Sequence, residues 1–470
     1  MELRRRRKKK RLSDAILPIG VCLLVVFLTA VLCLHKRLHA TERSGSTLTR
    51  PAEDANFQLG TRHRRAGTSG ETHKNEIDDD DGSKSDSNDE NENENDDEDE
   101  DEDPARLDPP ITPEEISRVE ALRLPEHPGT MANPGNPNEP LPYDVRRCPP
   151  QIPENYPYAW SILDVLGHWN PDNTTVPERV HQGLCIIDWR DPEQRKTAVR
   201  YRRAEVPFVV KHHPVIWKAA DRWTSEGYLH SKLGDKAYRN EHSVNNHMMY
   251  WKLRGKRRGP PGWEPPTQDV KLSYPDWREK ALEMEQLAAH QPESIPKTEH
   301  FYLRLNGAYE RAHEWLFDEL PFFDPSVQNN IFMVDPTDAR GINCRLGSRG
   351  TIAEAHYDMS RNFILILNGR KRYILAHPEQ CSNMELYPMG HPSARHSRVN
   401  WSDPLSYETT GKFPHSMVNE VVLEAGDGLY LPTYWLHFIV SLSLNYQCNA
   451  RSGITRGYQE HINACGFGKL

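Results

Sequence analysis

The chain has 470 residues and a formal net charge of −9 at pH 7, a length that allows two or three domains. The charge is unevenly distributed, because residues 78–103 contain 17 acidic side chains and one lysine, whereas residues 4–11 (RRRRKKKR) are all basic. The rest of the chain has a charge near −1. It therefore lacks the basic surface that nucleic-acid binding requires, and we expect no nucleic-acid partner.

Residues 16–34 (ILPIGVCLLVVFLTAVLCL) form an apolar run without a charged side chain. As a helix this run would be about 28 Å long, close to the hydrocarbon thickness of a bilayer. We expect a cytoplasmic tail at 1–15 and an uncleaved signal anchor at 16–35, because most basic residues precede the run. This predicts a single-pass type II membrane protein whose remaining chain lies in the lumen of the endoplasmic reticulum or Golgi, or outside the cell. The alternatives are a cleaved secretory signal and a nuclear localisation signal at 4–11.

Three further regions follow the predicted anchor. Residues 36–140 are predicted to be a disordered acidic stem, because such a composition buries too little apolar surface to offset chain entropy. A role of the acidic tract in weak calcium binding or in attracting a basic partner is the alternative to a solvated spacer. Residues 141–178 are a proline-rich lead-in, and residues 179–470 are expected to form one folded domain.

Cysteine usage and glycosylation sequons fit a secretory route. The six cysteines beyond the apolar run allow 15 disulfide pairings, among which the sequence cannot choose. They are Cys148, Cys185, Cys344, Cys381, Cys448 and Cys465. The sequons begin at Asn173 and Asn400 and are usable only in a lumenal environment.

The folded region predicts helices first and strands later. Residues 204–223 predict a buried strand followed by an amphipathic helix, and residues 277–289 and 308–320 predict further helices. From residue 330 the pattern changes to short β-rich segments, which predict a mainly β, α+β domain of the sandwich or jelly-roll type. These segments are NIFMV (330–334), FILIL (363–367), KRYIL (371–375), EVVLEAGDGLYLP (420–432) and HFIVSLSL (437–444).

One segment, EAHYD at 354–358, carries the candidate chemistry. In a strand, His356 and Asp358 share one face and Tyr357 lies on the other. The Asn368–Gly369 dipeptide predicts a hairpin between FILIL and RKRYIL, with Lys371 on the returning strand.

A second histidine, His437, lies in an apolar run further along the chain. Such a residue is commonly a core histidine, and an isolated His-x-Asp pair is commonly a surface feature. Two histidines and one carboxylate on a β scaffold, however, match the facial triad of non-haem Fe(II) oxygenases, which leaves three iron positions open.

Five motifs occur in an order that resembles the JmjC/cupin-like family of Fe(II)- and 2-oxoglutarate-dependent oxygenases. They are VPFVVK, EAHYD, NGRKRYIL, LYPMGHP and GDGLYLPTYWLH, within residues 179–465. The resemblance is closest to small hydroxylase-type members, such as the asparaginyl hydroxylase that inhibits hypoxia-inducible factor. It implies a double-stranded β-helix with flanking helices, and Fe(II), 2-oxoglutarate and O₂ as cofactor and cosubstrates.

The resemblance also assigns roles to individual residues. It implies that His356, Asp358 and His437 bind iron. It further implies that Lys371 pairs with the distal carboxylate of 2-oxoglutarate and that Tyr302 donates a hydrogen bond to the same group.

Other positions follow from the same resemblance. Asn362 and Asn449 align with asparagines near the iron-bound end of the cosubstrate. Ala353 departs from the family, which often has a cosubstrate-binding threonine there, and Thr351 is a candidate to compensate. Trp435 is predicted to be a core residue.

The resulting hypothesis is a lumenal hydroxylase that acts on a protein or small-molecule substrate and is attached to a membrane. Two rival classes remain. A type II Golgi glycosyltransferase has the same order of tail, anchor, stem and domain, but needs a nucleotide-sugar α/β domain. A cupin-like binding module without turnover is the other.

Overall fold

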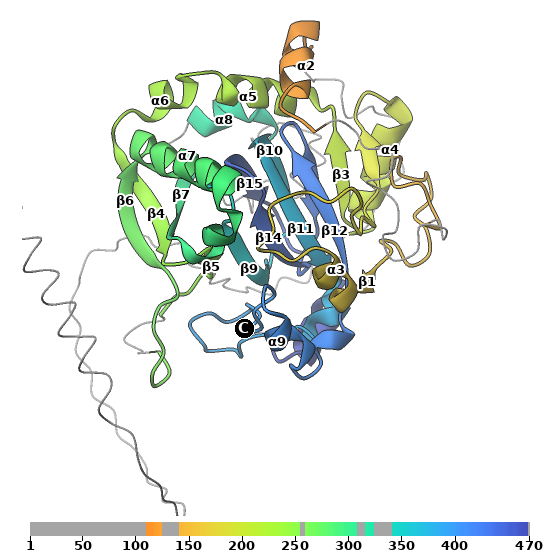
Figure 1. Cartoon of the computed structure of the whole chain (residues 1–470). Coiled ribbons are helices and arrows are strands. Elements are labelled where there is room, and N and C mark those ends of the chain that lie inside the picture. Colours follow the sequence, from red (N-terminus) through yellow and green to blue (C-terminus); the bar gives the residue numbers. More distant parts are fainter. Residues whose placement is uncertain (1–109, 125–140, 254–258, 308–314, 324–340, 469–470) are drawn as a thin grey trace, which may run out of the picture. The chain divides into compact units, whose positions relative to one another are not determined.

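The computed structural model describes residues 110–124, 141–253, 259–307, 315–323 and 341–468 (Figure 1). The predicted tail, the predicted anchor, most of the predicted stem and the NIFMV segment lie outside these ranges. Within the ranges, no helix combines the length and the apolar composition needed to cross a bilayer.

The described strands form two sheets that are antiparallel except for the β2–β3 and β5–β9 pairs. The nine-stranded sheet has the order β2 (Ile186–Asp188), β3 (Phe208–Lys211), β13 (Gly428–Leu431), β10 (Asn362–Asn368), β15 (Asn445–Arg451), β8 (Ile342–Gly347), β7 (His300–Gly307), β4 (Ala237–Ser243) and β6 (Gln268–Ser273). The six-stranded sheet has the order β1 (Trp160–Ser161), β12 (Met417–Glu424), β11 (Arg370–Ala376), β14 (Leu436–Ser441), β9 (Ile352–Tyr357) and β5 (His247–Met248).

The two sheets enclose a shared apolar core. The nine-stranded sheet contributes alternate residues of β10 and β13, namely Ile364, Ile366, Leu429 and Leu431. The six-stranded sheet contributes alternate residues of β11 and β12, namely Tyr373, Leu375, Val421 and Leu423. This arrangement confirms the predicted mainly β jelly roll with flanking helices. It is not the α/β domain that the glycosyltransferase alternative requires.

The Asn368–Gly369 turn does not form the predicted hairpin. β10 pairs with β13 and β15, whereas β11 pairs with β12 and β14, so the turn carries the chain from one sheet to the other. Gly369 has a φ of 69°, and a Cβ there would lie 2.0 Å from the carbonyl oxygen of Leu444. The dipeptide therefore correctly predicts a tight turn. The predicted pairing is wrong because both strands are buried and each finds neighbours on both sides within its own sheet.

Helices cover the nine-stranded sheet, with α5 packed on β10 and α7 packed on β6 and β7 (Figure 1). The helices of this layer are α4 (Pro192–Arg203), α5 (Pro214–Thr224), α6 (Tyr228–Leu233), α7 (Tyr274–His290) and α8 (Trp315–Glu319). The predicted strand and helix at 204–223 are β3 and α5, and the predicted helix at 277–289 is α7, which confirms these predictions. Of the predicted helix at 308–320, only the part that contains α8 is described.

Shorter helices complete the described part of the chain. They are α3 (Ile162–His168), α9 (Pro404–Glu408), α10 (Gln459–Ala464), and the 3-10 helices η1 (Pro292–Lys297), η2 (Pro321–Phe323), η4 (Pro378–Ser382) and η5 (Phe413–His415).

A short helix, α2 (Pro113–Glu120), forms within the region predicted to be a disordered stem, which corrects that prediction for residues 110–124. A capping box at Thr112 and Glu115 begins the helix. Val119 is fully buried, and Arg118 forms an ion pair with Asp221 of α5. Contacts distant in sequence, which composition does not reveal, therefore order this segment.

Residues 141–178 pack on the six-stranded sheet, where β1 pairs with β12. The fully buried Arg372 of β11 donates Nε–H to the carboxylate of Glu420 at 2.6 Å and Nη1–H to the carbonyl of Trp169 at 2.7 Å. Its guanidinium also lies 4.1 Å from the centroid of the Trp169 ring. Arg372 therefore connects the segment to the sheet through Trp169, while its ion pair with Glu420 joins β11 to β12.

All six cysteines beyond the apolar run form disulfides, in the pairs Cys148–Cys185, Cys344–Cys448 and Cys381–Cys465. Cys344 and Cys448 lie directly opposite each other on β8 and β15. The third disulfide connects η4 to the residue that follows α10.

Candidate metal centre

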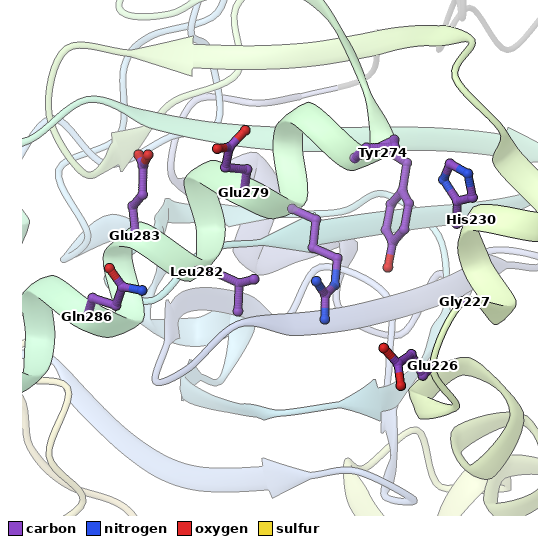
Figure 2. A pocket seen from close by; sticks show the side chains of 10 residues that line it. Glu226, Gly227, His230, Tyr274, Glu279, Leu282, Glu283 and Gln286 are labelled. Atoms are coloured by element: carbon purple, nitrogen blue, oxygen red, sulfur yellow. The ribbon is translucent and has the colours of Figure 1, made fainter.

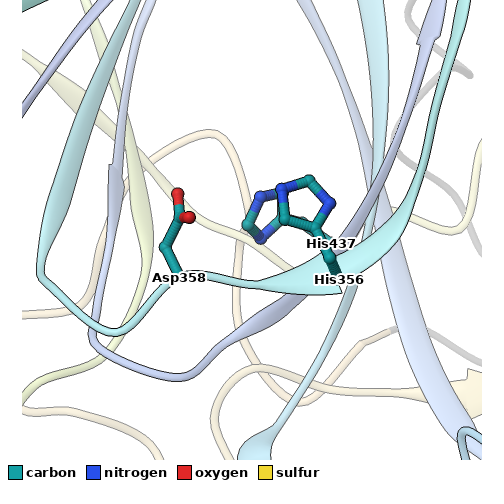
Figure 3. Close-up of side chains that lie close together, drawn as sticks. All are labelled: His356, Asp358 and His437. Atoms are coloured by element: carbon teal, nitrogen blue, oxygen red, sulfur yellow. The ribbon is translucent and has the colours of Figure 1, made fainter. Parts of the chain in front are cut away.

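Three predicted ligands converge on one side of the six-stranded sheet. His356 lies near the end of β9, Asp358 follows this strand, and His437 pairs directly with His356 from β14. One potential ligand atom from each residue lies within 4.8 Å of the other two (Figure 3). In the part of the chain that the structure describes, they are the one group of three or more potential ligands at such distances.

The two imidazoles have the same tautomer. Nδ1 of His356 lies 2.6 Å from the carbonyl of Glu354, and Nδ1 of His437 lies 3.0 Å from the carbonyl of Trp435. Because a carbonyl only accepts hydrogen bonds, each Nδ1 must carry the proton. Each Nε2 is therefore left with a lone pair, which is the form that binds a metal.

Electrostatics keep both histidines neutral and the aspartate ionised. Burial lowers the pKa of His356 and of His437. Burial alone would raise the pKa of Asp358, but Arg451, whose Nη2 lies 2.8 Å from its Oδ1, acts together with His356, His437 and Arg395 to hold that pKa below its usual range. The three groups thus have the protonation states that a divalent cation requires.

Lys371 and Tyr302, which the resemblance assigns to the same carboxylate, contact each other in the interior. The fully buried Nζ of Lys371 donates hydrogen bonds to the Tyr302 hydroxyl at 2.7 Å and to Oε1 of Gln447 at 2.8 Å. Among the described residues no carboxylate pairs with this ammonium, and burial lowers the pKa of Lys371 well below its usual value. A buried cation held only by neutral groups is suited to an anionic ligand.

The lysine lies at a suitable distance from the three ligands. On β11 the position opposite His437 is Leu375, and Lys371 lies four residues away on the same face. At the rise of a strand this separation is about 13 Å, which a lysine side chain and a five-carbon dicarboxylate can span together.

The two predicted asparagines join the same group. Nδ2 of Asn449 donates to Oδ1 of Asn362 at 3.0 Å, and Nδ2 of Asn362 donates to Oδ2 of Asp358 at 3.2 Å. Both asparagines are buried. They therefore orient the carboxylate of the triad.

The position that departs from the family is apolar. Ala353 of β9 lies opposite Ile439 of β14. The hydroxyl of the buried Thr351 lies 3.1 Å from that of Ser348, so it already has a hydrogen-bond partner. Trp435 belongs to the apolar core between the sheets, which confirms its predicted role.

Several residues of the site were not found from the sequence. Arg451 and Gln447 contact Asp358 and Lys371, respectively, and both lie on β15. The ring of His396 stacks on that of His356 with centroids 4.8 Å apart and an interplanar angle of 19°. The segment NYQCNAR (445–451) alternates polar with less polar residues, and this period of two could have revealed the polar inner face of β15.

An open pocket lies outside the jelly roll, against α7 and the start of α6 (Figure 2). Its lining includes Glu226, Tyr274, Arg278, Glu279 and Glu283. It contains none of the residues of the candidate centre and has charges of both signs.

The candidate ligands and Lys371 in the jelly roll fit Fe(II) and a dicarboxylate. The donor set is two imidazole nitrogens and one carboxylate, which is the ligand combination of the facial triad. The buried ammonium of Lys371 provides the complementary charge for a distal carboxylate.

Known proteins are similar in sequence to parts of this chain. Jumonji C domain-containing protein 5 of Drosophila melanogaster is 34% identical over 145 residues, which are 29% of this chain and 34% of the relative. Lysine-specific demethylase JMJ31 of Arabidopsis thaliana is 26% identical over 141 residues, covering 29% of this chain and 26% of the relative. JmjC domain-containing protein A of Dictyostelium discoideum is 20% identical over 275 residues, covering 56% of this chain and 96% of the relative.

The chain thus spans about a third or less of the first two relatives, and the activity in the name of the second belongs to that protein. A model of the cupin-like domain matches residues 194–450, more than half of the chain. This range contains every ligand and cosubstrate residue predicted from the sequence. The chain therefore belongs to the family of proteins with a cupin-like domain.

Proposed function

We propose that the protein is an Fe(II)- and 2-oxoglutarate-dependent oxygenase that hydroxylates a C–H bond of a protein or small molecule. The observation that carries this proposal is the convergence of His356, Asp358 and His437 in one jelly roll with the buried ammonium of Lys371. The near-neutral charge of the chain outside its two charged tracts, together with the secretory location proposed below, favours a hydroxylase over an enzyme that acts on chromatin.

Each side chain has a distinct task in this function. His356 and His437 present their Nε2 lone pairs, and Asp358 provides the negative charge. Lys371 and Tyr302 hold the distal carboxylate of 2-oxoglutarate, since both can donate hydrogen bonds to it. When bound, iron, 2-oxoglutarate and O₂ would supply an oxidative decarboxylation that yields succinate and CO₂, with one oxygen atom of O₂ entering succinate and the other entering the substrate as a hydroxyl group.

The test is iron binding and succinate formation by the full-length protein. His356→Ala, Asp358→Ala and His437→Ala should each abolish iron-dependent 2-oxoglutarate turnover, because two remaining ligands cannot hold Fe(II) in the required geometry. Iron per folded protein is measured under anaerobic reducing conditions, and thermal unfolding shows whether each variant is folded.

Tyr357→Phe is the matched control. Tyr357 points away from the centre and packs edge-on against Tyr434 and Phe467. Iron stoichiometry should remain that of the wild type. A folded wild-type protein that binds no iron would contradict the oxygenase proposal and favour a cupin-like binding module.

We also propose that the domain lies in the lumen of the secretory pathway or outside the cell, behind an anchor at 16–35. Three disulfides support an oxidising compartment. Both sequon asparagines are exposed, and each accepts a hydrogen bond from the backbone N–H two residues ahead, Asn173 from Thr175 and Asn400 from Ser402.

Topology can be tested separately from chemistry. An anchored protein should resist carbonate extraction, retain residues 4–11 and carry glycans at Asn173 and Asn400. Should N-terminal sequencing begin near residue 40, the anchor is excluded and the protein is secreted.

A further inference from the structure

A second group of cations lies beside Lys371 on the inner face of the nine-stranded sheet. Arg304 of β7 and Arg345 of β8 lie directly opposite each other, and Gln447 of β15 is the opposite neighbour of Arg345. Ile342, Cys344 and Leu346 pack in the outer core, so the alternating side chain of Arg345 points inward. Neither arginine has a role in the iron chemistry proposed above.

Within the described ranges, the positive charges of Arg304 and Arg345 are not balanced by carboxylates. Nη1 of Arg304 lies 2.9 Å from Oε1 of Glu241, but its buried Nε has no hydrogen-bond partner among the described residues. Arg345 forms one hydrogen bond within the described ranges, from Nη1 to the carbonyl of Cys344 at 3.3 Å, and no ion pair. Burial and the charge of Arg304 lower the pKa of Arg345 to about 9.

The repulsion extends to the cosubstrate lysine. Gln447, the opposite neighbour of Arg345, accepts a hydrogen bond from Nζ of Lys371, and the charge of Arg345 adds to burial in lowering the pKa of Lys371. Arg345 also interacts with Arg451, the partner of Asp358. An anion beside Arg345 would therefore offset the repulsion among Arg304, Arg345 and Lys371.

The group leads from the interior towards the surface. Lys371 is fully buried, and its partner Tyr302 lies two residues from Arg304 on the same face of β7. The guanidinium of Arg304 lies 6.0 Å from the ring centroid of Tyr250, whose side chain is exposed. A ligand whose carboxylate binds the two arginines could thus extend to the protein surface near Tyr250.

We propose that Arg304 and Arg345 form a second carboxylate-binding subsite, next to the Lys371–Tyr302 pair and separate from it. The forked guanidinium is the side chain best matched to a carboxylate, because it donates two parallel hydrogen bonds. This inference rests on the proposed function, since it places the subsite in an oxygenase active site.

Two sources could supply the carboxylate. It is either the distal carboxylate of 2-oxoglutarate, shared with Lys371, or an acidic group of the substrate. The charge of this group favours an additional anion. Among the described residues, the cations Arg304, Arg345, Lys371 and Arg451 face two carboxylates, Glu241 and Asp358, which leaves an excess of positive charge. Bound Fe(II) and the dianion of 2-oxoglutarate would cancel each other and leave this excess unchanged.

The first arm of the test measures N-oxalylglycine, an unreactive analogue of 2-oxoglutarate, by calorimetry on the full-length protein with Mn(II) in place of Fe(II). If the subsite holds the distal carboxylate, Arg345→Gln should weaken binding about tenfold or more. Arg345→Lys should restore part of the affinity because it retains the charge.

The second arm saturates the protein with N-oxalylglycine and titrates N-acetylaspartate amide, with N-acetylasparagine amide as the neutral control. If the subsite holds a substrate carboxylate, only the acidic probe should bind saturably. Arg345→Gln and Arg304→Gln should each remove this binding while leaving the affinity for N-oxalylglycine within twofold of the wild type.

The proposal is overturned if Arg345→Gln leaves the affinity for N-oxalylglycine unchanged and the wild type binds neither probe. If the glutamine variant unfolds, Arg345→Met removes the same charge with an apolar side chain of similar length. A wild type that binds neither Mn(II) nor N-oxalylglycine would contradict the oxygenase instead, and the acidic probe on metal-free protein then tests the subsite alone.

Discussion

The inner face of the nine-stranded sheet has two unlike halves. β10 and β13 present Ile364, Ile366, Leu429 and Leu431 to the core, whereas β7, β8 and β15 present Tyr302, Arg304, Arg345, Gln447 and Asn449. The apolar half contributes burial, which stabilises the fold. The polar half costs desolvation and repulsion, which bound anions can offset. Apart from Asn362 at the start of β10, which contacts Asp358, the strands that stabilise the fold are therefore distinct from those that carry the polar side chains.

The largest effect is predicted for a substitution in the apolar half. Ile366 is fully buried, so Ile366→Ala should lower the free energy of unfolding by about 2–5 kcal/mol through lost burial and a cavity. Urea unfolding measures this change, and iron per folded protein should stay constant. Leu405, which is 78% exposed, is the control, and Leu405→Ala should change stability by less than about 0.5 kcal/mol.

The helix that covers the apolar half should add a pH dependence. His213 precedes α5, and burial lowers its pKa to about 3 from 6.5. Between pH 6.5 and pH 3, His213 is therefore protonated in the unfolded chain but not in the folded chain. The contribution of the neutral His213 to the free energy of unfolding is fully present above pH 6.5 and falls as the pH is lowered towards 3. Relative to His213→Asn, which still caps the helix, the wild type should lose up to about 1.4 kcal/mol per pH unit in this window.

Urea unfolding between pH 7 and pH 4.5 gives this difference. The exposed His290→Asn variant of α7 controls for a general loss of histidine. Parallel curves for the wild type and His213→Asn would contradict the expected pH dependence.

Lys371 of β11 contacts the polar half through Gln447, and its replacement should change binding and not folding. Lys371→Ala should weaken 2-oxoglutarate binding about 10- to 100-fold, because one charge-assisted hydrogen bond contributes about 1.5–3 kcal/mol. Iron binding should be retained, since Lys371 is not a ligand. An unchanged affinity would show that the lysine does not contact the cosubstrate.

The smallest effect is expected where the two halves meet. The Tyr373 hydroxyl, in the apolar core, donates to Oε1 of Gln447 at 2.7 Å. Tyr373→Phe should cost about 0.5–1.5 kcal/mol of stability, because Gln447 keeps its bond to Lys371. A loss larger than this in the free energy of unfolding, measured with urea, would mean that the apolar core and the polar half interact through more than this one hydrogen bond.

Local signals predicted much of the site. The spacing of His356 and Asp358 places both on one side of a strand, and the apolar run around His437 predicts a buried strand. Lys371 reached the predicted interior position although its strand was predicted in the wrong pairing. Its inward direction depends on strand parity, which is the same in either sheet.

Contacts between distant segments were not predictable in this way. The sequence signal at Asn368–Gly369 specifies a turn, but which strands pair depends on the burial of both faces of β10 and β11. The pairing of Arg451 with Asp358 and the choice among 15 disulfide patterns likewise depend on strand order. The helix at 113–120 depends on Asp221, which lies about a hundred positions further along the chain.

The Cys344–Cys448 disulfide has a practical consequence for anyone who prepares this protein. Its two sulfurs lie on the outer face of β8 and β15. Cys344 precedes Arg345 in the sequence, and Cys448 lies between Gln447 and Asn449, so each cysteine is next to residues of the polar half. The spacing of these residues is thus covalently fixed from behind. We expect material expressed in a reducing cytosol to lack this disulfide and to bind the proposed ligands more weakly, even where the apolar half has folded.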